Sequence, residues 1–324
     1  MIETRYHDSV NVLQALTASG TAAPFDRAAW YALLADTGLV PLVAIASDAD
    51  ATAALALTER DRRITPLRNW YSFTWRALAP AGAAGDRLLE AIAQALKSRG
   101  YRVTLEPVPG EDDSAERLAR AFRKAGWKVT VEPCDINHIL FVRGRSFADY
   151  WQTRPGPLRT TLKRKANKVE VEVLTRFDLQ VWADYEAIYA ASWKPSEDQP
   201  AMLRAFAQAE GAAGRLRLGI ARADGLAVAA QCWTVENSIA YIHKLAHLES
   251  HKPLSAGTTL TAALFEHVID VDRVALVDFG TGDQSYKADW MEEVRPRFRI
   301  DCLDSAQPQS WPPLAKRLLR RTPS

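Results

Sequence analysis

Cysteine is scarce in this sequence of 324 residues. Three are present, Cys134, Cys232 and Cys302, and they lie far apart. An odd number, with no pair at the C-x-x-C spacing, argues against a disulfide framework and against a thiolate zinc site. The plain interpretation is three reduced thiols in a reducing compartment. We therefore expect no metal site.

Long apolar runs are also absent. The sequence has no stretch of about 18 apolar residues, so no transmembrane helix is expected. Its start, MIETRYHDSV, lacks the charged-then-apolar order of a signal peptide, which predicts a cytoplasmic protein. Charge of one sign does not dominate: 41 Lys and Arg against 39 Asp and Glu give a net charge of +2. Proteins that neutralise nucleic-acid phosphates are usually far more basic, so no DNA partner is expected.

Alternating strand and helix patterns fill the chain, and 48% hydrophobic residues over this length suffice for two domains. The first half predicts a helix at 26–36 with Asp26 as N-cap, strands at 40–45, 51–57 and 70–78, a helix at 86–98, a strand at 102–108, a helix at 114–125, and strands at 128–133 and 136–142. The second half predicts a strand at 170–174, helices at 178–192 and 199–210, strands at 215–222, 227–235 and 239–248, a helix at 257–270, a strand at 274–279, a helix at 284–293 and a strand at 298–303.

The two halves repeat this order. The expected helices at 86 and 257 start 171 residues apart, and the strands that come after them, at 102 and 274, start 172 apart. The aromatic strands that come before them, at 70 and 239, start 169 apart. A nearly constant offset is the signature of internal duplication. The alternative is that any α/β chain spaces its elements similarly.

The turn SHKPLSAG, between the expected strand 239–248 and the helix at 257, favours an anion site. Unpaired N–H groups and the helix dipole attract phosphate at a helix start. Lys252 and His251 add cations, and Gly257, Thr258 and Thr259 open the helix without an acid. In the first half Asp86 comes directly after the turn PAGAAG, and an aspartate N-cap would repel a phosphate. The alternative for SHKPLSAG is an ordinary strand-to-helix loop.

Five stretches of the second half make the pattern more specific: PLRTTLKRKANK, ASWK, GLAVAAQCW, YIHKLAHLESHKPLSAG and VDFGTGDQSYKADW. They resemble the GCN5-related acetyltransferase (GNAT) superfamily, in particular its BioF2-like branch, which is related to the FemABX peptidyltransferases. The phosphate loop typical of the superfamily, Arg/Gln-x-x-Gly-x-Gly/Ala, is matched by KPLSAG, with Lys252 in its first position and Ser255 in place of the first glycine.

This resemblance implies an α/β fold of two tandem GNAT folds, each a mixed central sheet flanked by helices. The expected domains are a degenerate copy at 1–145 and a catalytic copy at 146–324. It also implies an N-acyltransferase that moves an acyl group from acyl-CoA or an acyl carrier protein thioester to an amine. The acceptor would be a small molecule or a cell-envelope precursor.

Residue roles come from the resemblance and from the expected elements. Asp278 would accept a proton or position the nucleophile, Lys287 would stabilise negative charge, and Tyr286 would protonate the leaving thiolate. The expected donor-binding residues are His243, Lys244, Leu245, Lys252, Leu254, Ser255, Ala256, Gly257, Thr258 and Thr259. The expected substrate-binding residues are Trp193, Lys194, Gln231 and Lys163. Each has a structural alternative: a carboxylate that caps the GTGDQ turn, solvated lysines, a packed tyrosine, a structural histidine.

Three functions remain open. In the first, amine and thioester meet in a ternary complex, direct attack ensues, and amide N–H groups of the strand 239–248 polarise the carbonyl. The second is FemABX-like aminoacyl transfer from tRNA to an envelope precursor. The third is a non-catalytic binding protein that keeps the fold. The basic tail PPLAKRLLRR suits either transient contact with an anionic membrane surface or an acidic carrier protein, or is a frayed terminus.

Overall fold

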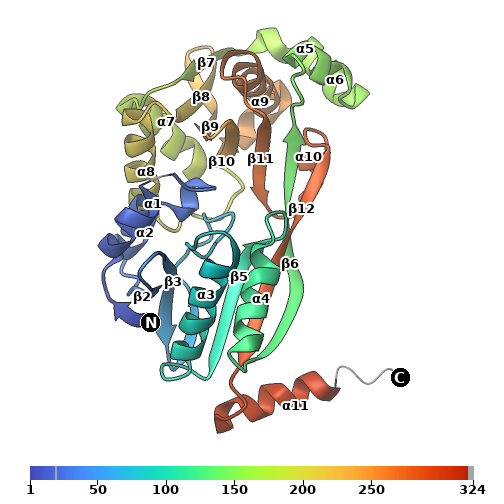
Figure 1. The fold of residues 1–324 in the computed structure, drawn as a ribbon. Coiled ribbons are helices and arrows are strands. Elements are labelled where there is room, and N and C mark those ends of the chain that lie inside the picture. The colour runs from blue at the N-terminus through green and yellow to red at the C-terminus, as the bar shows by residue number, and fades with distance from the viewer. Residues whose placement is uncertain (19, 320–324) are drawn as a thin grey trace. The chain divides into compact units, whose positions relative to one another are not determined.

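The chain forms two compact units (Figure 1). The computed structural model describes residues 1–18 and 20–319. Unit 1 consists of Met1–Ile136 and the chain from Arg295 onward, and unit 2 of Asn137–Val294. The last strand and helix thus belong to the first unit. The domain boundary expected between residues 145 and 146 stays a prediction, because compactness does not mark the limits of an ancestral copy.

Unit 1 contains a mixed sheet with the strand order β1-β2-β3-β4-β5-β12. Its strands are β1 (Glu3–His7), β2 (Leu42–Ser47), β3 (Thr52–Arg60), β4 (Arg63–Pro66), β5 (Arg102–Pro109) and β12 (Glu293–Leu303). Its helices are α1 (Gln14–Thr17), α2 (Ala28–Asp36), α3 (Gly82–Leu96), α4 (Ser114–Lys124) and α11 (Trp311–Leu319), with short 3-10 turns at Val10–Leu13, Pro24–Asp26 and Pro308–Ser310.

In unit 2 the strand order is β6-β11-β10-β9-β8-β7, again with parallel and antiparallel pairs. Its strands are the end of β6 (Lys128–Phe141), β7 (Glu170–Leu174), β8 (Leu216–Ala223), β9 (Leu226–Glu236), β10 (Ile239–His247) and β11 (Leu276–Thr281). Its helices are α5 (Phe147–Gln152), α6 (Gly156–Lys165), α7 (Leu179–Ala190), α8 (Pro200–Ala212), α9 (Ala256–Glu266) and α10 (Ser285–Ala288), with 3-10 turns at Ala166–Lys168 and Glu249–Leu254 and a π-helical end at His267–Val271.

The two units repeat one topology. Strands β2 and β8 begin at 42 and 216, β3 and β9 at 52 and 226, α3 and α9 at 82 and 256, and β5 and β11 at 102 and 276, so each difference is 174. In both units one parallel pair interrupts the antiparallel pairing: β4 with β5, and β10 with β11. The expected arrangement of two tandem α/β units, each with a mixed sheet flanked by helices, is confirmed. The internal duplication that would explain the constant offset stays a prediction.

An aromatic cluster holds α9 in unit 2. Phe265, near the end of α9, stacks on Tyr150 with ring centroids 5.3 Å apart and on Trp290 at 5.2 Å. Trp233 of β9 meets the same ring edge-on at 5.3 Å. The hydroxyl of Tyr150 donates to the backbone oxygen of Trp290 (2.8 Å). Such contacts fix a helix against its sheet with little freedom to shift, so the start of α9 has a defined position beside β10.

The segment expected as a strand at 70–78 is not one. After β4 the chain leaves the sheet and returns to it with a single bridge between Leu78 and Ala54. The aromatic residues in between are buried in the core of unit 1: Tyr71, Phe73 and Trp75. The apolar residues of this segment alternate because the segment is buried on several sides. A periodicity of two does not distinguish such a segment from a strand.

Asp86 was expected as the N-cap of its helix, and this was wrong. Helix α3 begins four residues earlier, at Gly82, with Ala81 as N-cap. Asp86 lies in the second turn, where its carboxylate accepts from Arg117 of α4 (2.5 Å). Alanine and glycine before Asp86 carry no start signal, so the first acidic residue was taken for the cap.

Other boundaries also differ from the expectation. Asp26 ends a 3-10 turn, and Arg27 is the N-cap of α2. Asp26 is buried against Arg76 (3.1 Å), and burial raises its pKa to about 6. The two strands expected at 128–133 and 136–142 are one strand, β6, and the helix expected at 284–293 is reduced to α10.

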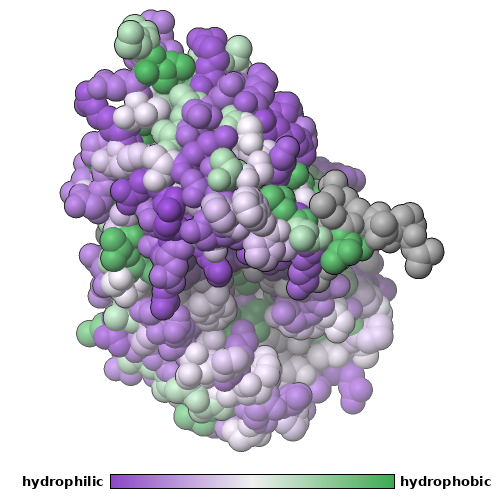
Figure 2. All heavy atoms as spheres, turned by 90° about the horizontal axis from the view of Figure 1, so that it is seen from below, coloured by the Kyte–Doolittle hydropathy of each residue, from purple (hydrophilic) through white to green (hydrophobic). Residues whose placement is uncertain are grey.

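The basic tail forms helix α11 rather than a frayed end, as far as the chain is described. Arg317 donates to the carboxylate of Asp301 (2.7 Å) and to the backbone oxygen of Lys128 (3.0 Å), which ties α11 to unit 1. The last two arginines of the tail, Arg320 and Arg321, lie outside the described residues. Within the described residues, none of the helices has the length and apolar character needed to span a membrane. Hydrophilic residues cover most of the face seen in Figure 2.

Candidate functional site

Strands β10 and β11 of unit 2 pair in parallel over a short stretch and then separate. Only Ile239–Tyr241 pair with Leu276–Asp278. Beyond that point β10 runs beside β9 to His247, with a bulge between Ile242 and Lys244, and β11 continues beside β6. A strand edge that leaves its partner offers backbone N–H and C=O groups to a ligand. The opening lies at the carboxyl ends of both strands.

A cavity of about 320 Å³ occupies this region. Its walls come from β10, the turn before α9, the first turn of α9 and the segment around α10. The residues that line it are Leu158, Trp193, Gln231, Leu245, Ala246, His247, His251, Lys252, Ser255, Ala256, Gly257, Thr258, Thr261, Phe279, Tyr286, Asp289 and Trp290. Eight of the expected donor- and substrate-binding residues are among them, together with Tyr286.

The start of α9 points its amides toward this cavity. Ser255 precedes the helix in a left-handed conformation (φ 55°, ψ 35°), and its side chain does not cap the helix. The amide of Thr259 bonds to the backbone oxygen of Ser255 (3.2 Å), whereas in the described chain the amides of Ala256, Gly257 and Thr258 have no hydrogen-bond acceptor. Free amides and the positive end of the helix dipole favour an anion here.

The cation at this helix start is Lys165, which the sequence did not single out. Its Nζ, at the end of the basic helix α6, donates to the Ser255 hydroxyl (3.1 Å). Lys163, the expected substrate-binding lysine, is exposed and does not line the cavity. Lys252 lines it but is mostly exposed and lies 3.5 Å from Glu249. Only the fold decides which lysine of a basic helix reaches α9.

Gln231 fastens α9 to the sheet. Its Nε2 donates to the Thr261 hydroxyl (2.7 Å) and to the backbone oxygen of Gly257 (3.3 Å), and its Oε1 accepts from the indole of Trp233 (2.9 Å). The amide is fully buried, and its polar atoms are used as burial requires. Gln231 therefore sets where the first turn of α9 lies.

Asp278 and Lys287 both bond to the backbone of residues 280–282, at the end of β11. Asp278 accepts from Asn137 Nδ2 (3.0 Å to each oxygen) and from the amide of Gly280 (2.8 Å). Lys287 Nζ donates to the backbone oxygens of Thr281 (2.5 Å) and Gly282 (3.2 Å). Both side chains are buried and neither lines the cavity. This geometry fixes the turn that leads to Tyr286; a catalytic role for the pair stays a prediction.

Tyr286 and His247 face the cavity. Tyr286 is 41% exposed and lies edge-on to Phe279, and burial raises the pKa of its hydroxyl. His247 packs against Trp193 with the ring centroids 4.3 Å apart and the ring planes tilted by 42°, and its Nε2 lies 3.3 Å from Glu249. Burial lowers the pKa of His247 below 6.5, so the ring is neutral at pH 7. No pattern in the sequence indicated that His247, rather than His243, would reach this place.

His243 and Lys244 point elsewhere. The bulge in β10 places His243 Nε2 2.7 Å from the Thr234 hydroxyl and its ring edge-on to Phe206. Lys244 is buried and donates to Glu197 (2.9 Å), and burial lowers its pKa to about 8. Neither lines the cavity.

The remaining expected residues lie outside the cavity between β10 and α9. Leu254 packs against the apolar core of unit 2, and Thr259 is buried, so neither borders the cavity. Lys194 borders a second cavity, between α7 and α8. Cys232 is buried in β9, which raises the pKa of its thiol to about 12 and disfavours the thiolate. Among the described residues, no group of three or more His, Cys, Asp or Glu side chains is placed to hold a metal ion.

Comparison with known proteins agrees with this geometry. Residues 157–288, which include all but two of the residues that line the cavity, match the family described as Acetyltransferase (GNAT) domain. Among curated protein sequences, none is significantly similar to the chain.

Several solved structures share the fold of nearly the whole chain. A crystal structure of FemX is 11% identical, with a TM-score of 0.64 over 94% of this chain and 98% of that one. L-PGS from Bacillus licheniformis is 12% identical, with a TM-score of 0.61 over 97% and 98%. The C-terminal domain of a putative lysylphosphatidylglycerol synthetase from Agrobacterium fabrum is 13% identical, with a TM-score of 0.60 over 92% of each chain. Residues 157–288 are therefore similar to the acetyltransferase (GNAT) domain, and nearly the whole chain shares the fold of FemX and of these related structures.

Proposed function

We propose that this protein transfers an acyl group from a thioester of CoA or of an acyl carrier protein to an amine. The observation that carries the proposal is the opening between β10 and β11, which leads into a cavity that ends at the uncapped start of α9. The diphosphate of a CoA donor would accept from the amides of Ala256, Gly257 and Thr258. Lys165 would add a positive charge beside it.

The thioester would then lie along the free edge of β10, where backbone amides polarise its carbonyl. The amine attacks this carbon directly, and a C–N bond forms as the C–S bond breaks. We assign the amine proton to His247, which is neutral at pH 7, and the proton for the leaving sulfur to Tyr286, whose raised pKa keeps it protonated. Asp278 and Lys287 act through the turn that they hold. The products are an amide and a free thiol.

Aminoacyl transfer is the second candidate. It is favoured by the similarity, over almost the full chain, to FemX, to L-PGS and to the C-terminal domain of a putative lysylphosphatidylglycerol synthetase. In this case the donor would be an aminoacyl-tRNA, and the acceptor an envelope precursor or a lipid. The basic last turn of α6, which contains Lys163, Arg164 and Lys165, would contact the RNA backbone.

The test is thermal unfolding against a panel of donors: CoA, acetyl-CoA, a long-chain acyl-CoA, an acylated carrier protein and an aminoacyl-tRNA. A donor that binds the folded state raises the unfolding midpoint by mass action. Acetyl-pantetheine, which lacks the diphosphate, is the matched control. A shift with an acyl-CoA and none with acetyl-pantetheine supports the first proposal. A shift with aminoacyl-tRNA alone replaces it with the second, and no shift with any donor favours a non-catalytic binding protein.

A further inference from the structure

A second, larger cavity lies between α7 and α8. Its volume is about 670 Å³, within the range of small-molecule sites, about 300–1,000 Å³. Aromatic and apolar side chains form most of its walls, among them Trp182, Tyr185, Tyr189, Pro200 and Leu203. It shares no lining residue with the cavity between β10 and α9. A cavity of this volume can hold a chain-like ligand that runs between the two helices.

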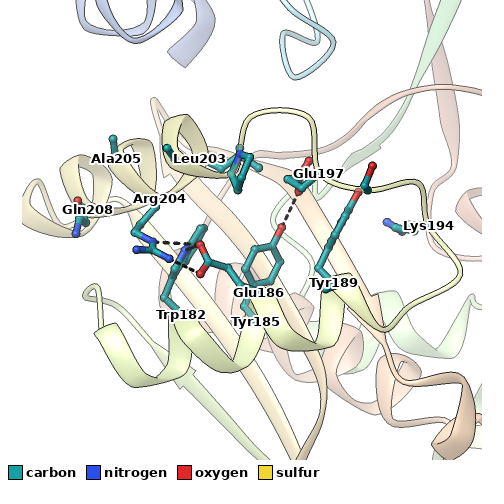
Figure 3. Close-up of a pocket in the computed structure, with 14 residues that line it drawn as sticks. Trp182, Tyr185, Glu186, Tyr189, Lys194, Glu197, Leu203, Arg204, Ala205 and Gln208 are labelled. Atoms are coloured by element: carbon teal, nitrogen blue, oxygen red, sulfur yellow. Dashed lines mark hydrogen bonds and ion pairs between the residues drawn. The ribbon is translucent and has the colours of Figure 1, made fainter. Parts of the chain in front are cut away.

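The two ends of this cavity carry different charges (Figure 3). At one end Arg204 is paired with Glu186, whose oxygen lies 3.1 Å from Arg204 Nε, so that end is neutral. At the other end lie Lys194 and Glu197. Tyr185 and Tyr189 lie between the two ends.

The carboxylate of Glu197 is already engaged. It accepts from Lys244 Nζ (2.9 Å) and from the hydroxyl of Tyr185 (3.3 Å). Lys194 is a second ammonium at the same end, and among the described residues no carboxylate oxygen lies within ion-pair distance of it. Its Nζ lies 5.8 Å from the ring centre of Tyr189 and 5.7 Å from that of Trp193. Two cations against one carboxylate leave an excess positive charge beside an apolar cavity.

Lys194 is partly removed from water. Burial lowers its pKa to about 8, and the neighbouring Glu197 only partly opposes this. A cation that has lost water without gaining an ion pair is complementary to an anion. An anion bonded to Lys194 would place any attached hydrocarbon along Tyr189 and Leu203.

We propose that this cavity binds an unbranched aliphatic carboxylate, with its carboxylate on Lys194 and its chain between α7 and α8. The site is distinct from the donor cavity and does not depend on the transfer reaction. The aromatic walls exclude water from the chain, and the paired Arg204 leaves the far end without a free charge. The occupant is thus a medium-chain fatty acid or a molecule that ends in one.

The test uses hexanoate, octanoate and decanoate below their aggregation concentrations, titrated calorimetrically into the full-length protein without any donor. Each added methylene should strengthen binding about fourfold, since burying a CH₂ contributes about 0.8 kcal/mol. Decylamine, with the same chain and the opposite charge, should bind far more weakly than decanoate. Equal binding of the two would overturn the proposal, as would the absence of any decanoate binding.

Two variants and a control separate charge from shape. Lys194→Met should weaken decanoate binding about tenfold, whereas Lys168→Met, the same charge change on an exposed turn, should leave it unchanged. Ala205→Phe should abolish binding by filling the cavity while Lys194 stays in place. If Lys194→Met and Lys168→Met weaken binding equally, net charge rather than this site is responsible. Because no donor is present, failure here leaves the proposed acyl transfer untouched.

Discussion

The two units differ in what borders the place where their parallel strands separate. In unit 2, β10 runs on beside β9 after leaving β11, and a cavity opens at the parting. In unit 1 the parallel pair β4 and β5 is also short, but Trp75 bridges the opening. Its amide donates to the backbone oxygen of Pro107 on β5 (2.8 Å), and its indole donates to Ala56 on β3 (2.9 Å). A cavity of about 460 Å³ also borders β4 and β5, lined among others by Thr65 and Glu106. The units therefore differ in the segment that crosses the opening, not in whether a cavity is present.

The starts of the matching helices, α3 in unit 1 and α9 in unit 2, also differ. At the start of α3, Arg117 donates to the backbone oxygen of Pro80 and to Asp86. The chain is closely packed at Gly85, the fourth residue of α3, where a Cβ would lie 2.0 Å from the Pro80 oxygen, whereas a Cβ on Gly82 would meet no atom within 4 Å. At Gly257, the second residue of α9, a Cβ would meet no atom closer than 3.5 Å. The arginine bound at the start of α3 is thus the feature that distinguishes it from the start of α9.

The largest effect is expected from removing the bridge in unit 1. Trp75 is 1% exposed, so Trp75→Ala should lower the free energy of unfolding by about 3–5 kcal/mol through the cavity it leaves. Trp70→Ala, at a tryptophan that is 51% exposed, should cost less than about 1 kcal/mol. Urea denaturation monitored by circular dichroism measures both. Similar losses in the two variants would show that Trp75 does not close this part of unit 1.

The second-largest difference between the units is expected when an acidic residue is introduced at the third position of α9 or of α3. Thr258 in α9 and Ala84 in α3 occupy this position. Thr258→Glu should weaken donor binding about thirtyfold by opposing the diphosphate, yet raise stability by a few tenths of a kcal/mol through the helix dipole. Ala84→Glu should raise stability by a similar amount and leave donor binding unchanged. Calorimetric titration of the donor found in the panel and thermal unfolding give the two numbers. Equal donor affinities would remove α9 from the site.

Two lysines on α6 give a finer comparison. Lys165→Met should weaken donor binding about threefold to tenfold, because the cation at the Ser255 hydroxyl is lost. Lys163→Met removes the same charge two residues away, on an exposed surface, and should change affinity less than twofold. Titration at two salt concentrations should show a smaller salt dependence for Lys165→Met alone. The reverse ranking would restore Lys163 as the substrate-binding lysine.

The sequence predicted most elements of unit 2 because each has a local signal. Strand β7 was expected at 170–174 and lies at Glu170–Leu174, and Asp178 is the N-cap of α7 as its type suggests. Local signals failed where tertiary packing decides. The aromatic segment 70–78 of unit 1 has the composition of a strand. Its backbone nevertheless leaves the sheet after β4, and its aromatic side chains are buried in the core.

The site was predictable in outline only. Strand β10, the turn after it and the start of α9 are consecutive in the chain, so the sequence pattern alone indicated this part of the candidate site. His247 was not found because one bulge in β10 shifts the alternation of the side chains beyond it. Glu197 and Lys165 act through partners 47 and 90 residues away, and no local pattern reports such contacts.

The smallest effect expected is a difference in pH response between the units, between pH 4.5 and 7.5. His247 in unit 2 has its pKa lowered below 6.5, so the unfolded chain binds its proton first, and folding stability falls as the pH drops below 6.5. Asp26 in unit 1 has its pKa raised from 3.8 to about 6, so the folded chain binds its proton first, and stability rises as the pH drops through 6. Either slope is bounded at about 1.4 kcal/mol per pH unit for one proton.

The opposite signs make the two contributions separable. In the intact protein they partly cancel near pH 6, so its thermal midpoint should change little there. His247→Gln should leave the midpoint rising as the pH falls, and Asp26→Asn should leave it falling. Thermal unfolding of the three proteins at intervals of half a pH unit measures this. A midpoint that moves in the same direction in both variants would mean that at least one group is not buried as its unit requires, and the contrast between the two units would lose its electrostatic support.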